Sequence, residues 1–221
     1  MQPGRARLAH GWTLVCSPSM SATLVRAFIR PAVRAVPASM ARRLGFCRIS
    51  LLVEVAAGVA SRWATTNVGL EVSLTTTGFE DHDVAMELLQ CLGQALWERL
   101  SDAQLREYWL LVWEELSMGI EGEIDEQALE EKRSLFDSRF CANSVERLAR
   151  YGRASLAGTA AEYVHCLWHE VTIRTGPDYL PALPLRRRLE LMVRWFPPDR
   201  GHRLFPAARR QAGASSSALG E

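Results

Sequence analysis

The chain has 221 residues, 48% of them hydrophobic and 23% charged, which is ordinary composition for a globular protein of one domain. Its formal net charge of +1 at pH 7 does not predict nucleic-acid binding, which depends on broad basic surfaces. No apolar run approaches the roughly 18 residues of a membrane span, so we expect no membrane partner and a cytoplasmic location. Length, composition and charge identify no partner, and they are compatible with a homodimer.

The basic residues are unevenly distributed. There are 25 Arg and one Lys, a bias typical of GC-rich, bacterial coding sequences. Residues 1–53 carry eight Arg and no acidic residue, a composition typical of an organellar transit peptide or of a non-native leader. Arg and Pro interrupt the apolar runs of this segment, so we expect residues 1–45 to be largely unstructured. A single domain is then expected over 46–206, and a disordered tail over 207–221.

The cysteines predict neither disulfides nor a cysteine-only zinc site. They are odd in number, widely spaced and form no C-x-x-C pair. Reduced thiols in a cytoplasm are the simplest interpretation. The five positions are Cys16, Cys47, Cys91, Cys141 and Cys166.

The first part of the expected domain is ambiguous between helix and strand. Apolar residues between Leu52 and Trp63 follow a helical spacing, although 49–55 also fits a buried strand. Helix is favoured here. Residues 68–77 alternate apolar and polar side chains and are rich in β-branched residues, which predicts a half-buried strand.

The remaining pattern is helical. An acidic first turn predicts a helix over 80–100, and Ser101-Asp-Ala-Gln104 has the pattern of a capping box that opens a Trp-rich helix to about Met118. Residues 121–133 indicate a connector and a solvated acidic helix. Further helices are expected over 144–175 and 185–196, with the arginines of the last reaching solvent beside an apolar stripe. The predicted fold is mainly α: a helical bundle of about five helices, with one short strand or small β element near 66–77.

The stretch "EYVHCLWHE" holds the strongest chemical signal. On a helix, Glu162, His165 and His169 share one face, because residues three, four and seven apart lie on the same side. Imidazoles one turn apart can converge on one metal ion. Glu162 is the candidate for a fourth ligand or a catalytic base.

The same helix also supports a purely structural interpretation. Its core stripe of Leu156, Val164 and Val171 lies opposite the histidines, which would place them in solvent if one face alone is buried. The histidine face, however, carries Ser155 and Gly158 upstream, and such small residues permit close approach of another element. A helix buried on both sides would explain both stripes.

A third ligand has to come from another element. Of the other histidines, His10 lies in the expected leader and His202 beyond the last helix, whereas His82 flanks the apolar face of the 80–100 helix. His82, His165 and His169 are therefore the candidate metal ligands. Zn²⁺ or Ni²⁺ is expected in preference to Fe or Mn.

This order of histidines, one early in a helix and an H-x-x-x-H pair some eighty residues later, resembles the DinB/YfiT-like metalloproteins. The resemblance covers residues 82–169 and rests on His82, His165 and His169. It implies a four-helix arrangement around a divalent metal held by three His, with an open position for water or a thiol. Several members of that family are thiol transferases or isomerases, so the resemblance implies thiol-transferase or hydrolase-like chemistry.

Two classes of function stay open. The first is a helical metalloprotein or metalloenzyme built on these three histidines. The second is a non-catalytic helical interaction module that meets a partner through the acidic segment 114–131 or the Trp-rich helix. The chain has no G-x-x-x-x-G-K-[ST], G-x-G-x-x-G, H-E-x-x-H or G-x-S-x-G motif, so nucleotide-binding, zincin and hydrolase-elbow functions have no local support. The metalloprotein requires His82 to lie close to His165 and His169. The interaction module does not.

Overall fold

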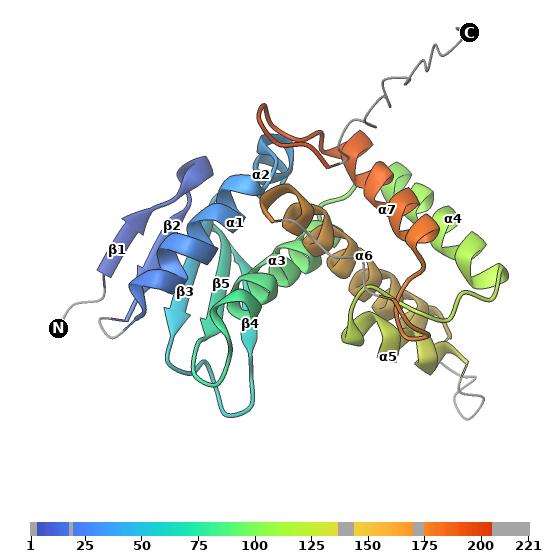
Figure 1. Cartoon of the computed structure of the whole chain (residues 1–221), viewed down its shortest axis with the longest axis horizontal. Coiled ribbons are helices and arrows are strands. Elements are labelled where there is room, and N and C mark those ends of the chain that lie inside the picture. Colours follow the sequence, from blue (N-terminus) through green and yellow to red (C-terminus); the bar gives the residue numbers. More distant parts are fainter. Residues whose placement is uncertain (1–3, 18–19, 137–143, 170–174, 205–221) are drawn as a thin grey trace, which may run out of the picture.

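The computed structural model describes residues 4–17, 20–136, 144–169 and 175–204. Its first third forms a five-stranded mixed sheet and the rest is helical, as Figure 1 shows. The strands are β1 (Gly4–Arg7), β2 (Thr13–Cys16), β3 (Cys47–Leu52), β4 (Ser61–Thr66) and β5 (Gly69–Thr75). The α-helices are α1 (Arg30–Ala35), α2 (Ala38–Leu44), α3 (Asp81–Trp97), α4 (Asp102–Ser117), α5 (Glu126–Leu135), α6 (Ser144–Trp168) and α7 (Ala182–Trp195).

The expectation of a mainly-α bundle is wrong. Of the described residues, 56% are helical and 17% are in strands, and they contain seven α-helices and a sheet in the order β1-β2-β3-β5-β4. The helix favoured between residues 52 and 63 is replaced by β3, a connection and β4. The reason is long-range pairing: β3 lies between β2 and β5, parallel to both, and Ile49 stands opposite Leu14 and Val72. The strand expected over 68–77 is present as β5.

Most of the segment expected to be an unstructured leader is folded. Residues 4–17 form the β1-β2 hairpin, and residues 20–45 contain a π-helix (Leu24–Ile29), α1 and α2. The arginines that suggested a leader lie on exposed positions of these elements, while apolar residues between them are buried, among them Leu24, Ile29 and Val33. The expected tail over 207–221 lies outside the described residues.

The helices cover one face of the sheet. Along β3, Cys47, Ile49 and Leu51 are buried, whereas Arg48 and Leu52 on the opposite face are exposed, as expected for a strand with one covered face. Helix α3 packs on β4, β5 and the π-helix, and α1 packs against α6. In Figure 1 the sheet lies beside this layer, and α4, α5 and α7 gather at the far side of α6.

Helix α6 is therefore central, with neighbours on several sides. It packs against α1, α3, α5 and α7, and its closest approach to α3 occurs at Gly93. A Cβ atom at Gly93 would lie 2.7 Å from the Cα and O atoms of Ala157. Leu156 and Val164 of the core stripe are buried on one side of α6, and Ser155 and Thr159 are fully buried on the other; Val171 lies outside the described residues. The helix is thus buried on two faces, the arrangement that its small residues indicated.

Local signals in the helical part are confirmed. The Ser101 side chain accepts a hydrogen bond from the Gln104 backbone amide, and the Gln104 side chain accepts one from the Ser101 amide, so the capping box is formed. None of the helices in the described ranges is long and apolar enough to cross a bilayer.

Candidate metal centre

The three candidate histidines come from the facing ends of two helices. His82 lies in the first turn of α3, His165 in the last turn of α6, and His169 just after the end of α6. Because α3 and α6 pack antiparallel across Gly93, the start of one helix meets the end of the other. Residues 83 positions apart in the chain thereby become neighbours.

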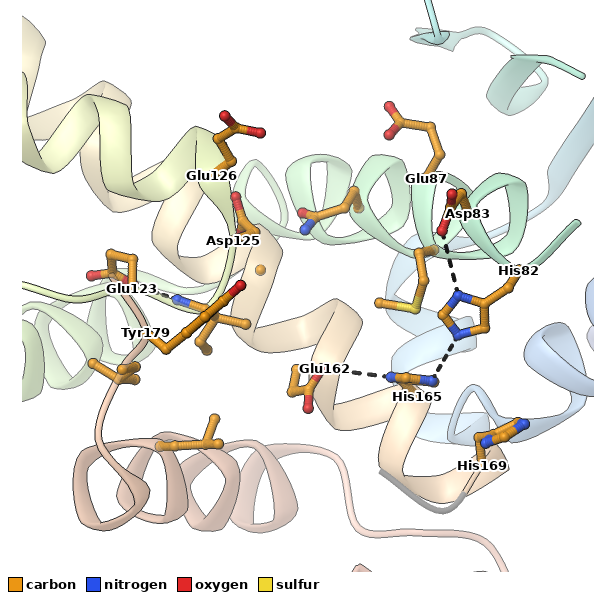
Figure 2. Close-up of a pocket in the computed structure, with 16 residues that line it drawn as sticks. His82, Asp83, Glu87, Glu123, Asp125, Glu126, Glu162, His165, His169 and Tyr179 are labelled. Atoms are coloured by element: carbon orange, nitrogen blue, oxygen red, sulfur yellow. Dashed lines mark hydrogen bonds and ion pairs between the residues drawn. The ribbon is translucent and has the colours of Figure 1, made fainter. Parts of the chain in front are cut away.

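His82 and His165 point directly at each other (Figure 2). Their Nε2 atoms are 3.1 Å apart. This is close to the separation of about 3.3 Å that two imidazole nitrogens adopt on one tetrahedral zinc ion. His165 is buried, at 8% exposure, whereas His82 is half-buried. The structure thus places His82 within metal-bridging distance of His165.

Each of these imidazoles has a carboxylate behind it. His82 Nδ1 lies 3.6 Å from Asp83 Oδ1, and His165 Nδ1 lies 3.6 Å from Glu162 Oε2. A carboxylate on this side favours a proton on Nδ1 and leaves Nε2 as a lone pair, which is the usual tautomer of a metal-bound histidine. The two carboxylates therefore favour two Nε2 lone pairs that face each other.

The short contact between the two Nε2 atoms needs either a proton, as in a hydrogen bond, or a metal ion between them. Two lone pairs 3.1 Å apart repel unless a proton or a metal ion lies between them. The buried Nδ1 of His165 also has no hydrogen-bond partner in the structure, and a buried unpaired polar atom needs a physical reason. A metal ion at Nε2 would give a reason for the unpaired Nδ1. It would make the Nδ1 proton more acidic and so strengthen the attraction of that proton to Glu162.

His169 lies beside the pair rather than in it. Its ring centre is 5.9 Å from that of His165 and 6.2 Å from that of His82, and its backbone amide still donates to the His165 carbonyl at 2.8 Å. Within the parts of the chain that the structure describes, no three His, Cys, Asp or Glu side chains already meet as a metal group. Two of the candidate nitrogens thus lie at a separation that suits one metal ion, and the third imidazole lies beside them.

An aromatic wall closes one side of the pair. The Trp168 ring stacks on His82, with centres 6.1 Å apart and planes 20° apart, and Phe28 meets both rings edge-on. Phe28 belongs to the π-helix that sequence reasoning placed in an unstructured leader. Apolar walls limit solvent access to a metal site and strengthen its electrostatics.

On the other side the histidines open into a cavity of about 650 Å³. Figure 2 shows its wall passing from the histidines along α3 and α6 to the 120–125 connector and Tyr179. Six carboxylates line it: Asp83, Glu87, Glu123, Asp125, Glu126 and Glu162. Apolar side chains fill the spaces between them, namely Met86, Ile124, Leu180 and Leu185.

Asp125 forms part of the cavity wall through a close fit to α6. Its Oδ1 accepts from the Ala128 amide at 2.9 Å, which caps α5, while its Oδ2 is buried without a partner. A Cβ atom at Gly158 would lie 1.9 Å from this Oδ2, so the absence of a side chain at Gly158 makes room for the carboxylate. Burial raises the pKa of Asp125, and the bond from Ala128 only partly offsets it.

A buried ion network holds the connector beside the cavity. Arg188 of α7 is fully buried and donates to Glu115, to Glu123 and to Ser155. Lys132 donates to Glu123 Oε1 at 3.3 Å. Burial raises the pKa of Glu123, but the field and hydrogen bonds of Arg188 and Lys132 outweigh it and hold that pKa at about 2.

Sequence reasoning missed this network. Glu123 belongs to the 121–133 segment expected to be a connector and a solvated helix, Glu115 belongs to the acidic segment 114–131 offered as a partner surface, and Arg188 was expected to reach solvent. A signal was present, because Arg188 lies three residues after Leu185 and four before Met192, inside the apolar stripe of α7 rather than at its edge. Two buried acids and two buried bases are stable together because their charges balance.

The other candidate groups do not join the site. His10 bonds to the Val33 carbonyl and His202 to the Leu167 carbonyl at 2.9 Å, the latter at the end of α6. Burial raises the pKa of the Cys166 thiol to about 12, with a further contribution from Glu162. That thiol is therefore a poor nucleophile.

Comparisons with known proteins give no relative. No protein-family model, no curated protein and no solved structure matches the chain.

Proposed function

We propose that the protein binds one divalent metal ion through His82, His165 and His169, and that Glu162 orients His165. The observation that carries this proposal is the pair of Nε2 atoms 3.1 Å apart, each ring backed by a carboxylate at its Nδ1. Zn²⁺ and Ni²⁺ suit an imidazole set best. Three protein ligands leave one coordination position free for water or a substrate atom, as in catalytic zinc sites.

The proposed chemistry is metal-assisted hydrolysis or transfer of a thiol. A bound ion of this kind lowers the pKa of a coordinated water or thiol and polarises a substrate oxygen. The chain's own contribution is the cavity that receives the substrate and the aromatic wall that keeps water from the back of the site. Glu162 lines the cavity as well as facing His165, so its carboxylate is placed to accept a proton from a group bound there.

Metal binding is tested on the full chain purified without a polyhistidine tag. We expect close to one equivalent of Zn or Ni by elemental mass spectrometry, and loss of that metal in both His82→Ala and His165→Ala, because each removes a nitrogen already in place. His169→Ala is expected to weaken binding less, since its ring stands apart from the pair. Added Zn²⁺ at about 100 times its dissociation constant should stabilise the wild-type chain by roughly 2.7 kcal/mol.

The matched control is His10→Asn, which removes an imidazole far from the site. Asn tolerates the left-handed backbone of His10, at φ 60°. This variant should keep the metal. A wild-type chain that neither contains nor takes up Zn or Ni, while its circular dichroism shows it to be folded, refutes the proposal.

The Glu162→Gln variant tests whether Glu162 orients the ligand His165. The amide keeps the shape of the side chain but loses the charge that holds the His165 Nδ1 proton. We expect metal affinity to fall by about 10- to 100-fold, the usual effect of removing a carboxylate behind a ligand histidine, with the fold unchanged. Competition with a chromophoric chelator measures the affinity. An affinity equal to that of the wild type would mean that Glu162 does not orient the ligand.

A second candidate function is interaction with a partner through α4. Trp113 is 61% and Leu110 is 72% exposed on this helix, and together with Trp109 they line a shallow apolar hollow. Exposed apolar patches of this kind mark interaction sites. The metal assay discriminates the two functions, because a binding module built on α4 requires no metal.

A further inference from the structure

The cavity next to the proposed metal has a strongly negative wall. Of its six carboxylates, Glu123 is neutralised by Arg188 and Lys132, and burial raises the pKa of Asp125, so neither is counted. Four remain: Asp83, Glu87, Glu126 and Glu162. Their only ion pairs in the described structure are those of Asp83 with His82 and of Glu162 with His165.

The described residues that line the cavity include neither Arg nor Lys. A divalent ion at the histidines adds two positive charges against four negative ones, so the loaded site keeps a negative potential. Clefts lined by one sign of charge concentrate ligands of the opposite sign and repel those of the same sign.

The histidine end of the cavity holds a buried polar atom that calls for a ligand nearby. His165 is more than nine-tenths buried, lines this cavity, and has an Nδ1 atom without a hydrogen-bond partner. The cavity also continues well beyond the space that a metal ion needs, to Tyr179 and Leu185. That far end is lined by apolar and aromatic side chains, which suits the apolar stem of a ligand.

We propose that the cavity binds, beside the metal, a ligand that carries a guanidinium or ammonium group on an apolar stem. This assignment rests on the proposed function and names the substrate class of the same site. The positive group lies among the carboxylates of α3, α5 and α6, and the stem lies against Met86, Ile124 and Leu185. Phosphate esters and other anions are excluded by the same wall.

The test uses three small probes of similar length and different charge. N-butylguanidinium is positive and does not coordinate metals, N-butylurea is its neutral analogue, and pentanoate is negative. Isothermal titration calorimetry on the zinc-loaded full chain should show that butylguanidinium binds at least tenfold more tightly than butylurea, and that pentanoate binds more weakly than either. The preference should shrink as salt is raised, because screening weakens charge interactions.

Two double variants test whether the preference for the positive probe arises from the cavity wall. Glu87→Gln/Glu126→Gln removes two charges from the cavity wall away from the histidines, and should weaken butylguanidinium binding about tenfold while butylurea binding stays the same. Glu121→Gln/Glu130→Gln removes two charges from exposed positions outside the cavity lining and should change neither. The metal content of every sample is measured in parallel.

The outcomes separate the two proposals. A chain that holds zinc but binds the guanidinium and urea probes equally, or whose Glu87→Gln/Glu126→Gln variant keeps the full preference, overturns the substrate class and leaves the metal centre standing. A chain that takes up no metal overturns the proposed function, and the substrate assignment falls with it. Metal uptake together with a charge preference lost in the cavity variant alone supports both.

Discussion

Replacing Arg188 by Met is expected to lower the free energy of unfolding by about 3–5 kcal/mol, the usual cost of removing one partner from a buried ion pair. The substitution leaves Glu115 without its charge partner and Glu123 with Lys132 alone. Both acids are fully or almost fully buried, so water cannot replace the guanidinium. Urea unfolding followed by circular dichroism measures the change.

Arg187→Met is the matched control for this prediction. Arg187 is the neighbouring residue, and its partner Glu114 lies on the surface, where an ion pair contributes little. Its unfolding midpoint should stay near that of the wild type. Equal midpoints for the two variants would show that the Arg188 network does not stabilise the fold.

Gly93→Ala should also destabilise the chain, by about 1–3 kcal/mol, as overpacking does in a well-packed core. The added methyl would lie 2.7 Å from backbone atoms of Ala157, and a helix backbone cannot move aside without separating α3 from α6. The direction of the change in the free energy of unfolding is diagnostic, because replacing Gly by Ala in an unobstructed helix raises that free energy by roughly 1 kcal/mol. Thermal unfolding by calorimetry gives the measurement.

Gly158→Ala provides the comparison, since it is also a glycine inside a helix. There the added methyl meets the tip of the Asp125 side chain, which can rotate away. We expect a smaller loss of stability than for Gly93→Ala. If Gly93→Ala proves as stable as the wild type, α3 and α6 do not approach as closely as described.

The helical half of the molecule could be predicted from the sequence because its signals are local. The capping box at Ser101 and the acidic first turn before Val84 depend on residues a few positions apart, and both helices begin where expected. The face shared by Glu162, His165 and His169 follows in the same way from helical spacing. The nearness of His82 to His165 was a hypothesis that depended on the packing of two helices, and it is met in the structure.

The sheet could not be predicted, because its strands are stabilised by partners far along the chain. Ile49 in β3 has neighbours at positions 14 and 72, and no local pattern records such pairing. The π-helix residue Phe28 was missed for the same reason, since its contact with His82 joins two elements more than fifty residues apart. Buried charges such as Arg188 were misjudged because a charge is assigned to solvent unless its partners are known.

The long separation of His82 and His165 has a consequence for unfolding. The proposed ion, if held by both, would close a loop of 83 residues and would act as a reversible cross-link between the start of α3 and the end of α6. By the chain-entropy relation used for disulfides, closing a loop of this length removes roughly 4–5 kcal/mol of entropy from the unfolded chain. Unlike a disulfide, this metal cross-link would depend on metal supply rather than on redox conditions. The folded protein would therefore last longer when the ion is abundant.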